Sequence, residues 1–462
     1  MIKKVFYKIK SKNQIHADWS IFVEALRFQL LPIISHKEKY FFDLEPVFRD
    51  RYEGAFSFDD VLVSATQRVI GCLQRYRLSW ISKKRLYIRP KDRFFNLYEK
   101  FLGNNFVYLT DSYRSLLDYS IYAPVYSSFF DKKNYELFFY ELLGCLSNNG
   151  IYLTNKEFSL LQKQSFLVVC SIEKVRRFFS VYSIDGLVLD GDSWLPGNVF
   201  SAFADQQNIP VLCLQHGLDC EHWCLDEALS SYYCVWGEER KKRYKERSEF
   251  QPREIFVTGN PLYDKFRFPQ KVSSGGNRWL LLTRPHTPEK CYESSRYPDE
   301  GKDVLRMILK ELLSFPDATL VIKPHPRDDT SPYKELVRSL SLLSRVSFAS
   351  MSRNCLECIQ NADIVFSEDS TSGAEAMILE KPVIHVSACK AGPCLPFIDY
   401  GAALSGLDST MLHDSISRLY AGLSPEEKKK MHKGMVEFIK DHCGDLDGRA
   451  SQRVASVVRN LF

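Results

Sequence analysis

One motif whose residue types could do chemistry is a histidine between two prolines, with a cationic residue on either side. The segment is KPHPR at 323–327. Because proline restricts the backbone, this turn presents the donor groups of Lys323, His325 and Arg327 in fixed positions. Two or three such donors are what a diphosphate or phosphoester requires. The motif predicts a phosphate site; the alternative is a strand exit whose charges are only solvated.

A run of hydroxyl side chains forms a second motif, STSGAE at 370–375. It follows an apolar segment and precedes a segment that favours a helix, so its donors gather at a helix N-terminus, where phosphate is stabilised. We expect the acid, in the first turn of that helix, to accept hydrogen bonds from ribose hydroxyls. A plain helix cap with an acidic first turn gives a similar pattern. The candidate ligands are Ser370, Thr371, Ser372, Gly373 and Glu375.

Two further motifs add a cation and a candidate base. TRPHT at 283–287 ends another apolar segment, and its Arg284 is a candidate ligand for phosphate or carboxylate. In QHGLD at 215–219, a glycine beside His216 allows close approach, and Asp219 lies three residues further on. This arrangement suits general-base work on a hydroxyl group. A histidine satisfied by its own fold is the structural alternative.

Two more carboxylates end the apolar segment that precedes QHGLD. They are Asp190 and Asp192, separated by one glycine. If they face the same crevice as His216, they are catalytic candidates together with that histidine and Asp219. Aspartate at a strand-ending turn is also common for local reasons, and this alternative stays open.

The cysteines carry no comparable signal. Thirteen of them occur at irregular spacing, as in a protein with reduced thiols. CLEC at 355–358 lacks a second pair at zinc-ribbon spacing, and CEHWC at 220–224 lacks a fourth ligand. We therefore expect structural thiols, no metal site and no cofactor.

The chemical motifs follow short apolar segments that alternate with helical patterns. Such alternation, with each strand running into glycine, proline or aspartate, predicts parallel α/β sheets. Ligands of these sheets bind beyond the carboxyl ends of the strands, so the motifs should converge there. Strands are expected at 186–190, 210–214, 232–236, 255–258, 279–283, 318–322, 346–348, 363–366 and 382–386, and helices at 135–146, 198–207, 303–313, 354–361 and 374–379.

A polar segment rich in glycine and serine, at 271–277, divides this pattern into two α/β lobes. We expect a first lobe over 1–270, in which the α/β pattern is legible at 166–264 and residues 1–160 show little pattern. The second lobe, over 278–440, carries the phosphate motifs.

The end of the chain predicts one more helix, within 441–462. Val454, Val457, Val458 and Leu461 share one helical face. We expect this apolar face to return to the first lobe.

The composition excludes several classes of protein. With 45% hydrophobic and 26% charged residues, the chain is globular and not disordered. Its 62 basic and 57 acidic residues leave a charge of +5, which is too small to indicate a nucleic-acid binder but suits phosphorylated ligands or an anionic membrane surface. We find no signal peptide and no run of about 18 apolar residues, so a cytoplasmic location is expected.

Five segments, taken in order, resemble the bacterial GT-B glycosyltransferases of capsule, lipopolysaccharide and teichoic-acid assembly. They are QHG, VWG at 235–237, VTGNPLYD at 257–264, KPHP, and STSGAEAMILEKPVI at 370–384. The resemblance covers roughly 186–386, under half of the chain. It implies the GT-B fold, in which two Rossmann-like lobes with parallel sheets face a central cleft. The acceptor would bind the first lobe, and the nucleotide-sugar donor would bind the second lobe alone.

Single motifs resemble those of narrower families. KPHP is similar to the His-Pro motif of bacterial sialyl- and Kdo-type capsule transferases, whose histidine contacts the nucleotide phosphate, and 370–372 resemble their hydroxyl motif. QHG and KPHP together resemble the two-histidine pattern of CDP-glycerol glycerophosphotransferases. The segment at 373–375 is similar to the ribose-binding acid of UDP-GlcNAc 2-epimerases, which share this fold. The acidic motif of sialyltransferases is matched only loosely by 190–192, and the first third of the chain departs from all of these families.

The resemblance implies transfer of a sugar from a nucleotide-activated donor to a growing bacterial surface polysaccharide (capsule, lipopolysaccharide or O-antigen) or to a lipid-linked acceptor. The partners would be a nucleotide-sugar and a glycan, with a peripheral contact at the cytoplasmic face of the inner membrane and no nucleic acid. Three alternatives stay open: a non-hydrolysing UDP-sugar 2-epimerase, a CDP-polyol phosphotransferase, and a non-catalytic subunit of polysaccharide assembly. An epimerase would be shorter and would not need this aromatic N-terminal region.

Overall fold

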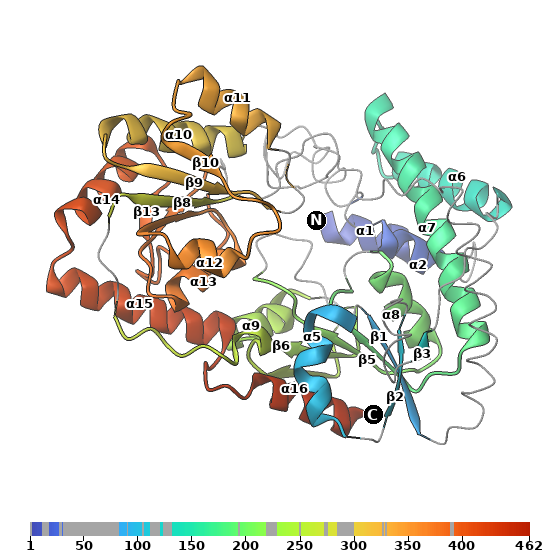
Figure 1. Ribbon diagram of the computed structural model, residues 1–462. Helices are drawn as coiled ribbons and strands as arrows, with labels where there is room; N and C mark the ends of the chain where they lie inside the picture. Colours follow the sequence, from blue (N-terminus) through green and yellow to red (C-terminus); the bar gives the residue numbers. More distant parts are fainter. Residues whose placement is uncertain are drawn as a thin grey trace.

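The strands that the structure describes form two sheets, each in its own lobe (Figure 1). The computed structural model describes residues 2–11, 18–26, 30, 83–89, 91–103, 106–110, 121–122, 132–192, 195–218, 229–248, 251–271, 276–283, 300–325, 328, 330–388 and 392–462. Within these residues every pairing between strands is parallel. This is the pair of parallel α/β lobes that the alternating sequence pattern predicts.

The first lobe holds a sheet whose described strands run in the order β3-β2-β1-β4-β5-β6-β7. They are β1 (Lys84–Arg89), β2 (Phe106–Thr110), β3 (Ile121–Tyr122), β4 (Gly186–Leu189), β5 (Val211–Leu214), β6 (Tyr232–Val235) and β7 (Glu254–Val257). The strands β4 to β7 match the predicted segments to within one residue. The strands β1 to β3 come from the first third of the chain, where no strand is expected from the sequence.

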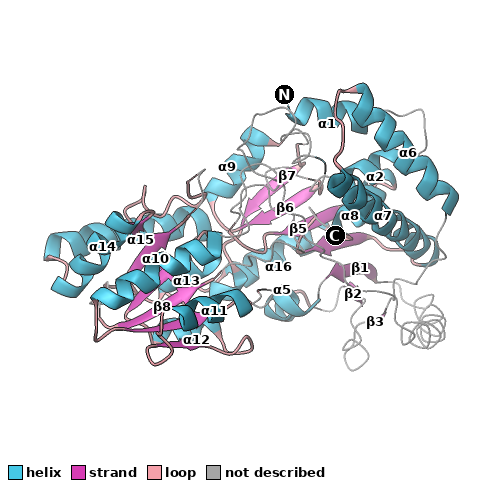
Figure 2. Cartoon of the chain, turned by 90° about the horizontal axis from the view of Figure 1, so that it is seen from above, coloured by secondary structure: helices cyan, strands magenta, loops and turns pink. Residues whose placement is uncertain are grey.

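Helices cover both faces of this first sheet, and α1 and α6 pack on other helices (Figures 1 and 2). The described helices of the lobe are α1 (Ile2–Lys10), α2 (Trp19–Ala25), α5 (Lys91–Tyr98), the 3-10 helix η1 (Glu99–Phe101), α6 (Lys132–Asn148), α7 (Asn155–Val181), α8 (Gly197–Gln206), α9 (Glu238–Arg247) and the 3-10 helix η3 (Pro261–Tyr263). Because side chains alternate along a strand, neighbouring residues of β4 enter different cores. Leu187 and Leu189 pack in the core that includes α7 and α8, whereas Val188 packs in the core that includes α5. Burial on both faces explains the uninterrupted apolar run GLVL.

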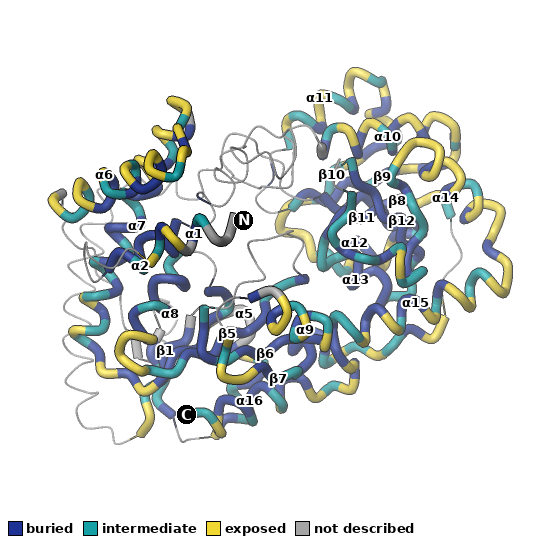
Figure 3. Tube along the Cα trace, turned by 180° about the vertical axis from the view of Figure 1, so that it is seen from behind, coloured by how far each residue is buried: buried dark blue, intermediate teal, exposed yellow. Residues whose placement is uncertain are grey.

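The second lobe repeats this plan, with the strand order β10-β9-β8-β11-β12-β13. Its strands are β8 (Arg278–Leu282), β9 (Thr319–Lys323), β10 (Val346–Phe348), β11 (Ile364–Ser367), β12 (Val383–Val386) and β13 (Leu404–Gly406). Its helices are α10 (Glu300–Ser314), α11 (Ser331–Ser339), α12 (Cys355–Gln360), α13 (Thr371–Ile378) and α14 (Ser409–Ala421). The tube in Figure 3 is dark blue along most of the central strands β8, β11 and β12, since the middle of the sheet is buried between its helices.

Each sheet has one point at which the chain reverses the direction of strand addition. In the first sheet this switch point lies between β1 and β4, and in the second it lies between β8 and β11. In doubly wound α/β folds, ligands bind in the crevice beyond the carboxyl ends of the strands at such a point. The topology therefore singles out the segments that follow β8 and β11.

Two helices close the chain and join the lobes. The long helix α15 (Pro425–Cys443) begins with a capping box between Ser424 and Glu427, and it contacts both α13 of the second lobe and α9 of the first. After a short turn, α16 (Ala450–Leu461) packs against α5, η1 and η3 of the first lobe (Figure 1). The side chains of Val454, Val457 and Val458 are buried there. None of the helices in the described part of the chain is long and apolar enough to cross a membrane.

Candidate functional site

The ends of β8 and β9 are tied together by one threonine. Thr283, the first residue after β8, accepts a hydrogen bond from the backbone N–H of His325 (3.0 Å) and donates one to Asp328 Oδ2 (2.8 Å). Thr283 and Asp328 are both buried, whereas His325 is half-buried. Thr283 and His325, one from each motif, therefore meet at the carboxyl edge of the second sheet, next to its switch point.

Lys323 is the last residue of β9, and its ammonium group donates hydrogen bonds to backbone carbonyl groups. Its Nζ donates to Met351 O (3.0 Å) and, at longer range, to Pro324 O (3.4 Å), and the side chain is buried. An ammonium group has three donors, so two of them are engaged within the lobe. This geometry gives Lys323 a structural task in addition to the phosphate contact predicted for it.

Three of the predicted site residues, Asp219, Arg284 and Arg327, lie outside the described residues.

The hydroxyl motif forms the beginning of helix α13, three residues earlier than predicted. Ser370 is the N-cap, and its Oγ accepts from the backbone N–H of Ser372 (3.3 Å) and lies 2.7 Å from Ser372 Oγ. Thr371, Ser372 and Gly373 thus occupy the first turn, and Glu375 opens the second turn instead of lying in the first. The expectation that the helix starts near 374 is wrong because Ser370 supplies the cap. Hydroxyl side chains and backbone donors still gather at this N-terminus.

Gly373 is required by packing. A Cβ atom at this position would lie 2.8 Å from both Ser367 Oγ and the ring of Phe397, which is closer than such atoms approach. The missing side chain lets α13 lie directly on β11. Its contribution to the predicted site is therefore to place the helix N-terminus at the switch point.

A buried carboxylate just before α13 holds the loop that follows β12, at the carboxyl edge of the second sheet. Asp369 is 4% exposed and accepts hydrogen bonds from the backbone N–H groups of Cys394 (3.0 Å) and Leu395 (2.8 Å). His385 Nε2 on β12 lies 3.2 Å from the same carboxylate. Asp369 thereby anchors the loop that follows β12. Sequence reasoning missed this residue, although its position between a strand and the hydroxyl motif was a signal.

In the first lobe, Gln215 shapes the loop that carries His216. Its Oε1 accepts from the backbone N–H of Trp236 (2.8 Å), and its Nε2 donates to Gly217 O (2.9 Å). An amide side chain can do both at once, which fixes the turn. His216 is half-buried, and Leu218 follows it toward the second lobe.

The lobes meet at helix α13. The backbone N–H of Leu218 donates to Thr371 Oγ1 (2.9 Å), and a Cβ on Gly217 would lie 3.4 Å from the same oxygen. One turn further along α13, the hydroxyl of Tyr263 donates to Glu375 Oε1 at 3.5 Å. We call these two contacts the lobe interface. The structure therefore brings the loop of the candidate base to the N-terminus of the candidate phosphate helix.

The two aspartates after β4 have different surroundings. Asp192 is 2% exposed, and its Oδ2 accepts from Ser230 Oγ (2.7 Å), the backbone N–H of Leu229 (3.2 Å) and the hydroxyl of Tyr233. Burial, followed by the charge of Asp192, raises the pKa of Tyr233 well above its ordinary range, so the tyrosine remains a donor. Asp190 is half-buried. A catalytic role therefore fits Asp190 better, and Asp192 holds the segment that leads into β6.

The cysteines among the described residues form no metal site. Burial, followed by the charge of Glu375, raises the pKa of Cys355 to about 12, so its thiol stays protonated at neutral pH. No group of three or more His, Cys, Asp or Glu side chains in the described part of the chain is arranged to hold a metal ion. Cys220, His222 and Cys224 lie outside the described residues.

The glycines of the VWG and VTGNPLYD motifs make room for the crossing chain. A Cβ on Gly237 would overlap Asp441 O, and a Cβ on Gly444 would overlap Trp236 O and approach Gly259 Cα. Gly259 and Gly444 also have positive φ angles of 78° and 84°. These motifs therefore hold the segment between α15 and α16 against the first lobe.

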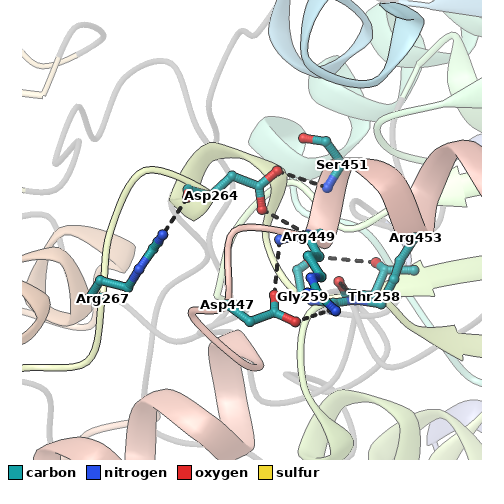
Figure 4. A network of polar contacts seen from close by, with 9 residues as sticks. Thr258, Gly259, Asp264, Arg267, Asp447, Arg449, Ser451 and Arg453 are labelled. Atoms are coloured by element: carbon teal, nitrogen blue, oxygen red, sulfur yellow. Dashed lines mark hydrogen bonds and ion pairs between the residues drawn. The ribbon is translucent and has the colours of Figure 1, made fainter. Parts of the chain in front are cut away.

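Polar contacts complete this attachment (Figure 4). Asp264 accepts from the backbone N–H groups of Ala450 (2.8 Å) and Ser451 (3.0 Å), in the first turn of α16. Arg453 pairs with Asp447 (2.7 Å) and donates from Nε to Thr258 O (2.7 Å). The last residues of VTGNPLYD thus fasten the closing helix and orient η3, which carries Tyr263.

Solved structures of other proteins share the fold of this chain at low sequence identity. No protein-family model matches the chain, and no curated protein sequence matches it significantly. Among solved structures, S. aureus MnaA in complex with UDP is 12% identical with a TM-score of 0.51, over 82% of this chain and 96% of MnaA. A proposed UDP-N-acetylglucosamine 2-epimerase from Listeria monocytogenes is 15% identical with a TM-score of 0.50, over 82% of this chain and 97% of that one. The chain therefore has the GT-B fold, with two parallel α/β lobes.

Proposed function

We propose that the chain is a GT-B glycosyltransferase that moves a sugar from a nucleotide-activated donor to a bacterial surface polysaccharide or a lipid-linked glycan. One observation carries the proposal: residue types that bind phosphate converge at the switch point of the second sheet, and the first lobe meets them there. Thr283 ties the two strand ends, α13 begins beside them, and Leu218 reaches Thr371. A helix N-terminus with hydroxyl and imidazole donors suits a nucleoside diphosphate.

On the donor side, each predicted residue has a task in this proposal. The N-terminus of α13, with Thr371 and Ser372, would stabilise the leaving phosphate, and His325 would donate to the charge that develops on it. Glu375 would bind the ribose. Lys323, Arg284 and Arg327 would add positive charge around the diphosphate. Ser370 and Gly373 act indirectly, since they cap and seat the helix.

On the acceptor side, His216 would remove the proton from the attacking hydroxyl. Its loop is fixed by Gln215 and ends at α13, so a base at this point would face the donor. Asp190 is the second candidate, and Asp219 would orient the imidazole ring or raise its basicity. Catalysis would then depend on positioning and on charge stabilisation, with no cofactor or metal.

The proposal also includes the acceptor glycan and the cellular location of the reaction. We propose a capsule, lipopolysaccharide or O-antigen glycan, handled at the cytoplasmic face of the inner membrane. The support is the order of the five motifs and the modest positive charge of +5, which suits an anionic surface.

A 2-epimerase is the second candidate, favoured by the structural comparisons. MnaA was solved with UDP, and the Listeria protein is a proposed UDP-GlcNAc 2-epimerase. The two functions share the donor site and differ in the need for an acceptor. UDP is therefore the first nucleotide to test.

A nucleotide-release assay separates these functions. Sugar nucleotides are incubated with the protein, with and without a glycan acceptor, and both free nucleotide and sugar-nucleotide isomers are quantified. Release that requires the acceptor supports transfer, whereas isomerisation without acceptor supports the epimerase. A protein whose melting temperature is unchanged by CMP, UDP, GDP and CDP, and which does neither reaction, contradicts both functions.

A further inference from the structure

The face of α13 that carries Thr371 and Glu375 is turned toward the first lobe. Residues four apart lie on the same side of a helix. Both side chains form hydrogen bonds with first-lobe groups, Thr371 with the N–H of Leu218 (2.9 Å) and Glu375 with the hydroxyl of Tyr263 (3.5 Å). A ligand held by Glu375 would therefore sit where the two lobes meet.

Tyr263 is held in a fixed position by its surroundings. It is 3% exposed, and its ring lies 6.0 Å from the ring of Trp236 and 5.9 Å from that of Phe266. The 3-10 helix that carries it is capped by Asn260, whose Oδ1 accepts from the N–H of Leu262 (3.0 Å). The next residue, Asp264, fastens α16. The hydroxyl group is thus directed at Glu375 by packing on several sides.

The charge of Glu375 acts on the same region. Burial, and after it the Glu375 carboxylate, raises the pKa of the thiols of Cys355 on α12 and of Cys443 at the end of α15. Cys443 lies in the crossing between the lobes, next to Gly444, where an added Cβ would overlap Trp236 O. Together with its contact to Tyr263, this places the Glu375 carboxylate on the side of α13 that faces the first lobe.

We propose that Tyr263 is a positioning residue that orients the Glu375 carboxylate for the ribose of the nucleotide, so that the ribose subsite is built by both lobes. The inference rests on the proposed function of Glu375 and extends the donor site beyond the second lobe. A carboxylate offers about four acceptor positions. The tyrosine hydroxyl at Oε1 restrains the rotation of the group, and other positions would accept the ribose hydroxyls. Without the tyrosine hydroxyl, ordering the carboxylate would cost free energy on binding.

The test is the affinity for UDP and for 2′,3′-dideoxy-UDP, measured by calorimetry on the full chain. Wild type is expected to prefer UDP, because only UDP has the hydroxyls that meet Glu375. In Tyr263→Phe the affinity for UDP should fall about tenfold, while the affinity for dideoxy-UDP stays within a factor of two. The matched control is Tyr400→Phe, which removes another tyrosine hydroxyl from a carboxylate, Asp441 (2.9 Å). This control should leave the preference for UDP unchanged.

Three other outcomes would contradict the inference or the proposed UDP site. If Tyr263→Phe weakens both nucleotides equally, Tyr263 is merely structural, and the inference is wrong. If UDP binds and the variant keeps wild-type affinity, the inference alone is wrong. If wild type binds no UDP, the proposed UDP site fails as well.

If the Tyr263 variant does not fold, a measurement on the wild-type protein still tests the inference. Hydrogen exchange of a peptide spanning 260–266 should slow when UDP is added, because the ribose would hold η3 against α13. Exchange that is unchanged at saturating UDP overturns the shared subsite.

Discussion

The partners of a side chain, more than its chemical type, separate the candidate catalytic residues from the structural ones. Asp190 and Asp192 follow the same apolar segment, and the sequence alone does not distinguish their roles. In the structure, Asp192 is buried with three donors on one oxygen, whereas Asp190 is half-buried at the end of β4, which pairs with β5. Substitution of the two should therefore have different consequences.

Asp192→Asn is expected to lower the free energy of unfolding by about 2 kcal/mol, because it disturbs buried hydrogen bonds to a charged acceptor. Asp190→Asn should leave stability within about 0.5 kcal/mol and lower kcat. Urea unfolding and turnover of both variants check this. An Asp192 variant that is stable but inactive would return the catalytic role to Asp192.

His325→Ala should weaken turnover strongly, since it removes a fixed donor from developing negative charge. By analogy with the loss of one oxyanion-hole donor, about 2–4 kcal/mol of transition-state stabilisation should be lost. The control is His413→Ala, which removes a more exposed histidine that is paired with Glu311 on another face of the lobe. Near-native kcat and KM in a folded His325 variant would contradict the role given to KPHP.

His216→Ala should lower kcat more than it weakens nucleotide binding, because the histidine is assigned to the acceptor hydroxyl. Steady-state kinetics and nucleotide calorimetry on the same preparation separate these effects. Loss of nucleotide binding would assign His216 to the donor instead, which its loop contact with Thr371 permits.

Sequence reasoning at this scale could identify residues with distinctive chemistry. His216, His325 and the hydroxyl run stand out because their types and spacing suit phosphate and proton transfer. Tyr263 could not be found in this way. A tyrosine within PLYD has no chemical signature, and its partner Glu375 is 112 residues away along the chain.

At the scale of elements, continuous apolar runs made the central strands legible. Each of β4, β5, β11 and β12 is buried along its length, so it reads as an apolar run closed by polar residues. The sequence of β1, KRLYIR, is charged at both ends, and its partner β4 lies about 100 residues further along, as in the pairing of Leu86 with Gly186. Only the three central residues of β1 are apolar, and β3 is two residues long, so neither strand gives a clear apolar run in the sequence.

Glycine positions show where elements approach most closely. Gly237→Ala should lower the free energy of unfolding by about 1–3 kcal/mol, because the added Cβ overlaps Asp441 O and must displace the end of α15. Gly144→Ala is the control. Its site on α6 is open, and alanine there should stabilise the helix by about 0.5–1 kcal/mol. Equal stability of the two variants in chemical unfolding would show that the crossing does not depend on this contact.

At the scale of the whole molecule, the crossing from α15 to α16 couples the lobes and contains a half-buried histidine. His442 stacks on Phe438 with ring centroids 4.3 Å apart, and burial lowers its pKa to about 4. Asp441 opposes this shift and Arg243 adds to it. The imidazole is therefore neutral in the folded protein at neutral pH.

This histidine predicts a loss of stability in acid. Between pH 6.5 and 4 the unfolded chain binds a proton that the folded protein excludes, so stability falls as the pH is lowered through this range. The contribution is about 3 kcal/mol by pH 4. His442→Phe should reduce the loss, measured as the difference in unfolding free energy between pH 7 and pH 4.5. The same pH dependence in the variant would place the acid sensitivity elsewhere.

The central claim is that a nucleotide binds at the switch point of the second sheet, against the N-terminus of α13, with its ribose on the carboxylate that the first lobe positions. A crystal structure of the full chain with UDP tests it most directly. We predict phosphate oxygens within hydrogen-bond distance of Ser372 or Thr371 and of His325, and ribose hydroxyls on Glu375. UDP bound at any other edge, or with its phosphates away from α13, would contradict the account.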